Sequence, residues 1–144
     1  MRYARLTAAT LLALAAPGSA RDSTPGPFHG NWRMVAADDR GDHGLMAITI
    51  QLGRREVRGG GDYAMHQPMC SFLDGGEIRG DGECALTGGS FTAVRRVGQR
   101  LVLTLAPSAD GTIHRLTFGR RGEKLVGTYR TDRLVRAVIL EPAP

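Results

Sequence analysis

Hydrophobic side chains recur at every second position along most of this chain, and this period constrains the fold more than any other feature. Between residues 46 and 52, Met, Ile, Ile and Leu alternate with Ala, Thr and Gln. Such alternation is typical of β-strands with one buried face, and no window after residue 20 keeps helical spacing for three turns. Strand-like runs lie near residues 30–36, 45–53, 55–65, 69–74, 77–86, 89–95, 99–106, 112–119, 123–130 and 134–140.

Short turns separate these runs. Asp74-Gly75-Gly76, Asp81-Gly82 and Asp110-Gly111 supply residues that adopt positive φ in tight hairpins. Short connections favour antiparallel neighbours, and closing the sheet removes its exposed edges. The chain of 144 residues allows one domain. We therefore predict an all-β fold: a single small antiparallel up-and-down barrel of about eight strands, formed by residues 29–144.

The first twenty residues have the layout of a secretory signal. Arg2 and Arg5 precede an apolar run over residues 6–16, which ends in Pro-Gly-Ser-Ala at residues 17–20. We expect cleavage after Ala20, and a periplasmic or secreted protein. The apolar run is too short to span a membrane, and no membrane span is expected elsewhere. Residues 21–28 are rich in Pro, Gly and Ser and are predicted to form a flexible leader.

The charge distribution excludes some classes of partner. The chain carries 19 basic and 14 acidic residues, with a net charge of +5. Removing residues 1–20 takes away two arginines and leaves a mild excess of three positive charges. Acidic residues are interspersed and no long run of one sign occurs, so a nucleic-acid partner is not expected. The arginines are interpreted as the solvated exterior of a monomeric barrel.

Cys70 and Cys84 are the only cysteines. Both follow the signal, in an oxidising compartment, and both lie in runs expected to be strands. We predict a disulfide that links neighbouring strands. Closing a loop of about 15 residues contributes about 3 kcal/mol in the chain-entropy model.

An alternative use of this region is the binding of copper. Met65, His66 and Met69 lie beside Cys70, and thioether, imidazole and thiolate groups are ligands that suit Cu(I). The disulfide is preferred, and the methionines are interpreted as core residues. The acidic segment 38–43 does not have the order of an EF-hand loop and is interpreted as a polar loop. No metal and no cofactor are expected.

The sequence contains no recognised catalytic motif. Ser90 lacks the Gly-x-Ser-x-Gly context, and the four histidines do not form a His-Glu-x-x-His pattern. His114 shares its phase with Leu116 and Phe118, which predicts an inward, hydrogen-bonded core histidine. A non-enzymatic protein is therefore expected.

The first expected strand opens with Gly30-Asn31-Trp32, which resembles the Gly-x-Trp start of lipocalins and related calycins. In that family the Trp plugs one end of the barrel beneath an Arg from near the C-terminus. The resemblance implies that Trp32 is the plug and that Arg133 or Arg136 covers it through a cation–π contact. The barrel would then hold a small apolar ligand. The inward residues expected to line its site are Trp32, Met34, Met46, Ile48, Phe91, Leu103 and Leu116.

Exported bacterial metalloprotease inhibitors of the alkaline-protease-inhibitor type are also similar, with a signal, an N-terminal arm, a Gly-x-Trp strand and one disulfide. This resemblance implies that the leader, residues 21–28, enters a protease cleft as a protein-binding arm. The family disulfide lies nearer the first strand than Cys70–Cys84 does. A META-type domain shares the same start. A third alternative is an envelope structural or interaction protein without a ligand.

Overall fold

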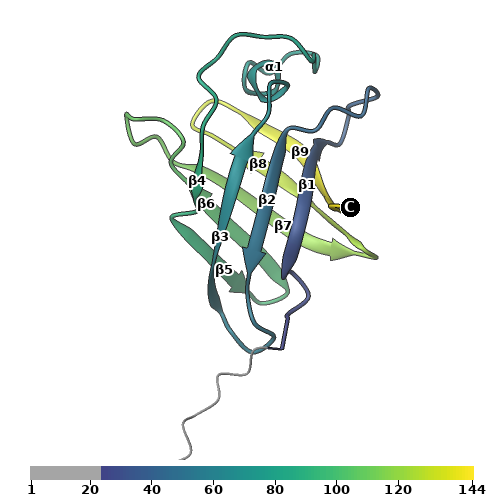
Figure 1. Ribbon diagram of the computed structural model, residues 1–144, viewed down its shortest axis with the longest axis vertical. Coiled ribbons are helices and arrows are strands. Elements are labelled where there is room, and N and C mark those ends of the chain that lie inside the picture. The colour runs from purple at the N-terminus through teal and green to yellow at the C-terminus, as the bar shows by residue number, and fades with distance from the viewer. Residues whose placement is uncertain (1–23) are drawn as a thin grey trace, which may run out of the picture.

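The computed structural model describes residues 24–144 and shows a small barrel with one short helix (Figure 1). The helix, α1, spans Met69–Leu73. The strands are β1 (Gly30–Ala36), β2 (Met46–Gln51), β3 (Arg58–Met65), β4 (Gly88–Ser90), β5 (Ala93–Val97), β6 (Arg100–Leu105), β7 (His114–Arg121), β8 (Lys124–Arg130) and β9 (Val135–Pro142).

The strands pair in a closed antiparallel ring. β1 pairs with β2 on one side and with β9 on the other, β2 pairs with β3, and the strands from β5 to β9 each pair with the next along the chain. β4 and β5 both pair with β3 and act as one strand interrupted at residues 91–92, so the barrel has eight strands. The predicted all-β, up-and-down barrel is confirmed.

The period-two pattern forms the core. On β1, Trp32, Met34 and Ala36 are buried, and the corresponding inward positions of the other strands join them in one hydrophobic cluster. Burial of these side chains is the main stabilising term of such a fold. Gly127 on β8 is required because a Cβ there would overlap the carbonyl oxygen of Thr117 on β7. Because β7 and β8 approach each other closely at this point, no side chain fits at residue 127.

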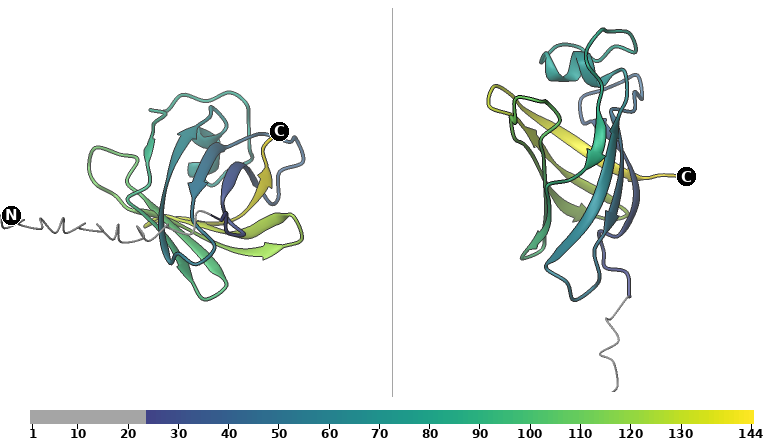
Figure 2. Two further views of the ribbon diagram at one scale, coloured as in Figure 1. Left: turned by 60° about the horizontal axis from the view of Figure 1, so that its bottom comes forward. Right: turned by 60° about the vertical axis from the view of Figure 1, so that its left-hand side comes forward.

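The barrel has two different ends. At one end lie the loops 37–45, 66–87, 106–113 and 131–134, and α1 sits over the strands there (Figures 1 and 2). At the opposite end lie residues 24–29 and the short connections 52–57, 98–99 and 122–123. We call the first the capped end and the segment 66–87 the cap.

The described part of the expected leader, residues 24–28, is hydrogen-bonded to the barrel. The amide of Gly26 donates to the carbonyl of Leu52 (3.1 Å), and the amide of Arg54 donates to Thr24 (2.9 Å). Phe28 is buried at the end opposite the cap. The predicted signal, residues 1–20, and residues 21–23 lie outside the described residues.

Two of the expected strands are absent from the described chain. Residues 69–74 form α1 and its C-terminal cap, and residues 77–86 form no strand. Both edges of β3 are already occupied, by β2 and by β4 with β5, so the intervening segment has no free edge to join. Gly75 and Gly82 have φ of 80° and 154°, which bends the segment into a loop. No helix among the described residues has the length and apolarity needed to cross a membrane.

Candidate functional site

The cap closes one mouth of the barrel with side chains from α1. Met69 and Phe72 are fully buried and belong to the barrel core. Cys70 and Cys84 form the predicted disulfide, which is confirmed, but it joins α1 to a loop rather than two neighbouring strands. The hydroxyl of Ser71 also accepts a hydrogen bond from the amide of Arg79 (2.9 Å). The cap is thus a closed unit laid over the strands.

Arg136, near the start of β9, fastens the cap to the barrel. Its Nη1 donates to the carbonyl oxygens of Phe72 and Gly76, at 3.0 Å each. Its guanidinium carbon lies 4.7 Å from the centroid of the Phe72 ring, a cation–π geometry. Nη2 lies 3.4 Å from Oδ2 of Asp38, whose side chain is 73% exposed, whereas that of Arg136 is 12% exposed. Nη1 is therefore firmly held, whereas the contacts of Nη2 with the two oxygens of the solvated Asp38 carboxylate are long, at 3.5 and 3.4 Å.

Beneath Phe72 the core contains a buried polar pair. The Phe72 ring meets Tyr129 edge-on at 5.4 Å, and the Tyr129 hydroxyl lies 2.5 Å from Nδ1 of His114. Burial lowers the pKa of His114, although Asp132 and Asp110 oppose this effect. Burial also raises the pKa of Tyr129. Both groups are therefore neutral near pH 7 and satisfy each other, as predicted for a core histidine.

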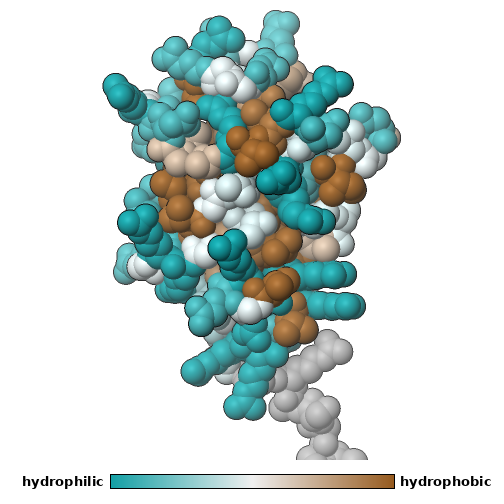
Figure 3. Space-filling model, turned by 180° about the vertical axis from the view of Figure 1, so that it is seen from behind, coloured by the Kyte–Doolittle hydropathy of each residue, from teal (hydrophilic) through white to brown (hydrophobic). Residues whose placement is uncertain are grey.

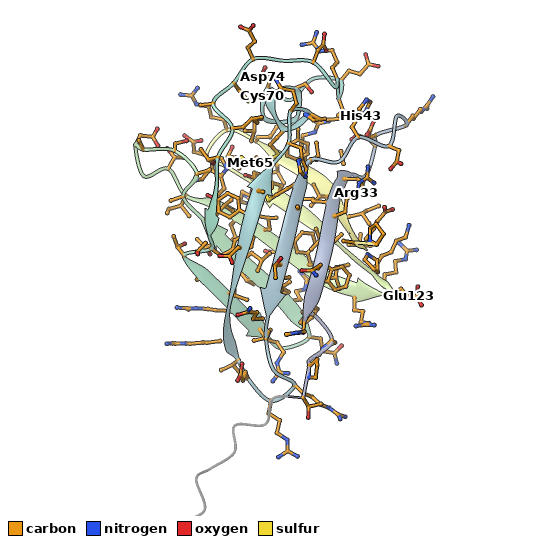
Figure 4. All side chains as sticks on the ribbon, in the orientation of Figure 1. Arg33, His43, Met65, Cys70, Asp74 and Glu123 are labelled. Atoms are coloured by element: carbon orange, nitrogen blue, oxygen red, sulfur yellow. A yellow bond between two sulfur atoms is a disulfide. The ribbon has the colours of Figure 1, made fainter. Side chains whose placement is uncertain are left out.

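A cleft of about 580 Å³ opens beside the cap, between it and the loop 37–45. Its lining is polar and charged, and Ile78 adds an apolar side chain. The lining residues are Asp38, Asp39, Arg40, Gly41, His43, Gly75, Gly76, Glu77, Ile78 and Arg136. Figure 4 shows His43 at this end of the molecule, near the labelled cap residues Cys70 and Asp74. The cleft and the apolar mouth of the barrel therefore meet at Arg136.

Asp39 stabilises the loop 37–45, which forms one wall of this cleft. Its carboxylate accepts hydrogen bonds from the amides of Gly41 (2.9 Å) and His43 (2.7 Å), and it lies 3.1 Å from Nδ1 of His43. Burial alone raises the pKa of Asp39, but these amide hydrogen bonds and the His43 ring outweigh it and the pKa is lowered. The ionised carboxylate thus stabilises the loop 37–45.

Methionines line the barrel wall beneath the cap. Met34, Met46 and Met65 face one another in register across β1, β2 and β3, and Met69 comes down from α1. Met65 lies at the cap-side end of β3 (Figure 4). Methionine is flexible and polarizable, so a wall built from it can repack around different shapes.

The seven residues expected to line a ligand site all point into the barrel. Each is buried and joins the same core cluster. They are spread along the barrel: Met34 and Met46 lie near the cap, whereas Trp32 lies toward the opposite end, where its indole N–H donates to the carbonyl of Phe28 (3.0 Å). They contact the core rather than the cleft.

The expected arginine cover over Trp32 differs from the observed arrangement. Arg136 lies over Phe72, at the other end of the barrel from Trp32. Arg133 is exposed and has a distant contact of 3.9 Å with Asp132. The two residues follow β8 at the capped end, which is why neither reaches the indole.

The residues of the copper alternative do not converge. His66 is exposed, Met69 is fully buried, and Cys70 is oxidised in the disulfide. Among residues 24–144, no group of three His, Cys, Asp or Glu side chains is placed to hold a metal ion.

Sequence reasoning missed the residues that make the mouth. Phe72 lies in a run whose sequence pattern predicts a strand. The only sequence signal for a helix in this run is Pro68, which precedes the first turn of α1. In the sequence, Asp38 belongs to the acidic segment 38–43, which is expected to be only a polar loop. Arg136 was singled out, but for a contact with another aromatic ring.

Comparisons with known proteins leave the family open. No family model and no curated protein matches the chain. A crystal structure of a mutant of the fluorescent protein UnaG is similar at 16% sequence identity and a TM-score of 0.43, covering 82% of this chain and 97% of that one.

Proposed function

We propose that this chain is an exported, non-enzymatic binding protein. Its ligand is a small molecule with an apolar body and one anionic group, taken up at the capped mouth of the barrel. The signal-like residues 1–20 and the Cys70–Cys84 disulfide support export to an oxidising compartment. The periplasm and the cell exterior both fit these two features.

The observation that carries the proposal is the position of Arg136 between a polar cleft and an apolar plug. A carboxylate or sulfonate that enters the cleft would replace Asp38 at Nη2, because their 3.4 Å contact is long and solvated. Charge-assisted hydrogen bonds to guanidinium are shorter and stronger than that contact. The bonds from Nη1 to Phe72 and Gly76 keep the guanidinium oriented for it.

The apolar body of the ligand would take the place of the Phe72 ring, while the carbonyl of Phe72 stays bound to Arg136. This ring closes the mouth from α1, which is a separate element from the barrel wall. The methionines beneath it then adapt to the ligand. The core of the free protein is filled with side chains. A ligand can still bind if the Phe72 side chain leaves the core and the ligand occupies the space that it vacates.

Anilinonaphthalene sulfonate, an apolar fluorescent anion, tests the proposal. We expect saturable binding at one site, weakened about tenfold or more by Arg136→Gln because a charged hydrogen bond is lost. Asp38→Asn should tighten binding because it removes the competing carboxylate. Arg133→Gln is the matched control: it removes the same charge from the same end at an exposed position and should change the affinity less than twofold.

Neutral N-phenylnaphthylamine, which has the same apolar body without the sulfonate, separates the two halves of the site. Its binding should be weaker and should not show the tenfold loss that Arg136→Gln causes for the anionic probe. Equal effects of Arg133→Gln and Arg136→Gln on the anionic probe, or no saturable binding, would rule out this site. The leader alternative has less support, since residues 24–28 are bound to the barrel rather than free to enter a cleft.

A further inference from the structure

The end opposite the cap carries a dense group of arginines. We call residues 54–58 and 95–100 the basic rim; they form the β2–β3 loop and the β5–β6 hairpin with their flanking strand ends. The rim contains a single carboxylate, Glu56, which folds back to accept the amide of Gly53 (3.1 Å). Its six arginines are Arg54, Arg55, Arg58, Arg95, Arg96 and Arg100.

Two of these arginines face each other in the sheet. Arg58 on β3 is the register partner of Arg95 on β5, and both side chains are exposed. Like charges directly opposite each other destabilise a sheet. No ion pair with a carboxylate is described for either residue within residues 24–144. The arrangement becomes favourable when an anion lies between or above the two guanidinium groups.

Exposed aliphatic side chains lie among the charges. Val57 is 58% exposed and Val97 is 60% exposed. The amide of Arg96 donates to the carbonyl of Val57 (2.8 Å), so the two segments that carry these valines lie side by side at the same end of the barrel. Seen from behind, this end of the molecule shows small hydrophobic areas between long hydrophilic side chains (Figure 3).

The capped end shows that this pattern is not a general property of the surface. Its loops carry carboxylates among their cations, and Arg33, Arg133 and Arg136 each lie within 4 Å of a carboxylate. Arginines that serve only to solvate a surface are expected to be mixed with acids in this way. Arg58 and Arg95 of the basic rim, by contrast, form no such pair with a carboxylate of residues 24–144.

We propose that the basic rim is a docking surface for an anionic phospholipid membrane. Guanidinium groups bind lipid phosphates with paired hydrogen bonds, and the two valines insert between the headgroups. A bilayer is the partner favoured over a soluble polyanion because exposed valines gain from an apolar interior and not from phosphate alone. The barrel would then stand on the membrane with its capped mouth pointing away.

Vesicle co-sedimentation of the purified protein tests this surface. We expect binding to phosphatidylcholine vesicles that contain phosphatidylglycerol, little binding to pure phosphatidylcholine vesicles, and loss of binding at high salt. Each arginine at an anionic membrane surface is worth about a fivefold change in partitioning. The double variant Arg58→Gln/Arg95→Gln should therefore bind about 25-fold less tightly. Val57→Ser/Val97→Ser should also weaken binding without changing the charge.

A matched control exists on the same barrel. Arg115 on β7 and Arg130 on β8 are also register partners, but they lie on the half nearer the cap. Arg115→Gln/Arg130→Gln removes the same charge from the same kind of pair and should leave vesicle binding within about twofold. If both double variants lose vesicle binding equally, the net charge of the protein and not the basic rim determines binding. That result would overturn the proposal.

Two further outcomes would also overturn it. One is the absence of binding to phosphatidylglycerol vesicles. The other is binding of inorganic phosphate or a soluble oligonucleotide through Arg58 and Arg95 while Val57→Ser/Val97→Ser has no effect on any ligand. The result does not depend on the probe-binding test of the mouth, because the two sites share no residue.

Discussion

The two ends of the barrel are closed by different means. Opposite the cap, the chain entering β1 closes the barrel: Phe28 is buried and its carbonyl holds the indole of Trp32. At the capped end, closure depends on a separate segment held by Phe72, the disulfide and Arg136. A plug continuous with the strands can open only with the barrel, whereas a separate cap can open alone. In the proposed function, this difference is the reason for placing ligand entry at the capped end.

The largest expected effect comes from removing the plug at the end opposite the cap. Trp32→Ala should lower the free energy of unfolding by about 3–5 kcal/mol, since it leaves a cavity in the continuous core. Phe72→Ala should lower the free energy of unfolding by only about 1–2 kcal/mol, because the cap can detach while the barrel stays folded. Urea denaturation followed by far-ultraviolet circular dichroism measures both values. Equal costs would show that the cap and the barrel unfold as one unit.

The disulfide should matter locally. Cys70→Ser/Cys84→Ser should lower the stability of the cap by up to about 3 kcal/mol, through the chain entropy of the opened loop. Hydrogen exchange should accelerate at the amides of α1 and leave those of β6, β7 and β8 protected. If the whole barrel loses protection together, the cap is required for the fold and the contrast between the ends fails. Chemical reduction of the native protein is the control for the two serines.

The strand pattern of the barrel and the presence of the disulfide were easier to predict from sequence than the conformation of the cap. Alternation determines which face of a strand is buried, so residues such as Met46 and Ile48 could be placed in the core without a structure. The disulfide followed from the count of cysteines and the compartment. These inferences use local pattern or composition alone.

The cap could not be predicted in the same way. Its apolar run over residues 69–73 fits a strand or a helix, and the choice depends on whether a sheet edge is free. The edges of β3 are occupied by strands distant in sequence, which no local pattern reveals. For the same reason the sequence could not show that Arg136 lies over Phe72 rather than that Arg133 or Arg136 covers Trp32, because the contact depends on which loops meet at the capped end.

Acid should affect the capped end through Asp39. Because the pKa of this carboxyl is lowered in the folded protein, its stabilisation is present above the unfolded pKa near 4 and is lost as the pH falls through the folded value. Asp39→Asn should cost about 1 kcal/mol at neutral pH and remove this contribution at low pH. Hydrogen exchange at the amides of Gly41 and His43 reports the loop, and Trp32 fluorescence reports the opposite end. The exposed Asp74→Asn is the control, and an unchanged pH profile for Asp39→Asn would contradict the role of this carboxylate.

The smallest expected change in stability concerns two cross-strand pairs of arginines, Arg58–Arg95 and Arg115–Arg130. Replacing Arg58 by Thr should raise the free energy of unfolding by about 0.2–1 kcal/mol at low salt, because it relieves repulsion from Arg95. A double-mutant cycle isolates this coupling from changes in β propensity. The Arg115–Arg130 pair should show the same sign, since both are register partners of like charge. Phosphatidylglycerol vesicles should abolish the gain at Arg58 and leave the gain at Arg115 unchanged, because only the basic rim would face the lipid. If vesicles change neither coupling, the repulsion at residues 58 and 95 is a tolerated cost rather than a feature of a binding surface.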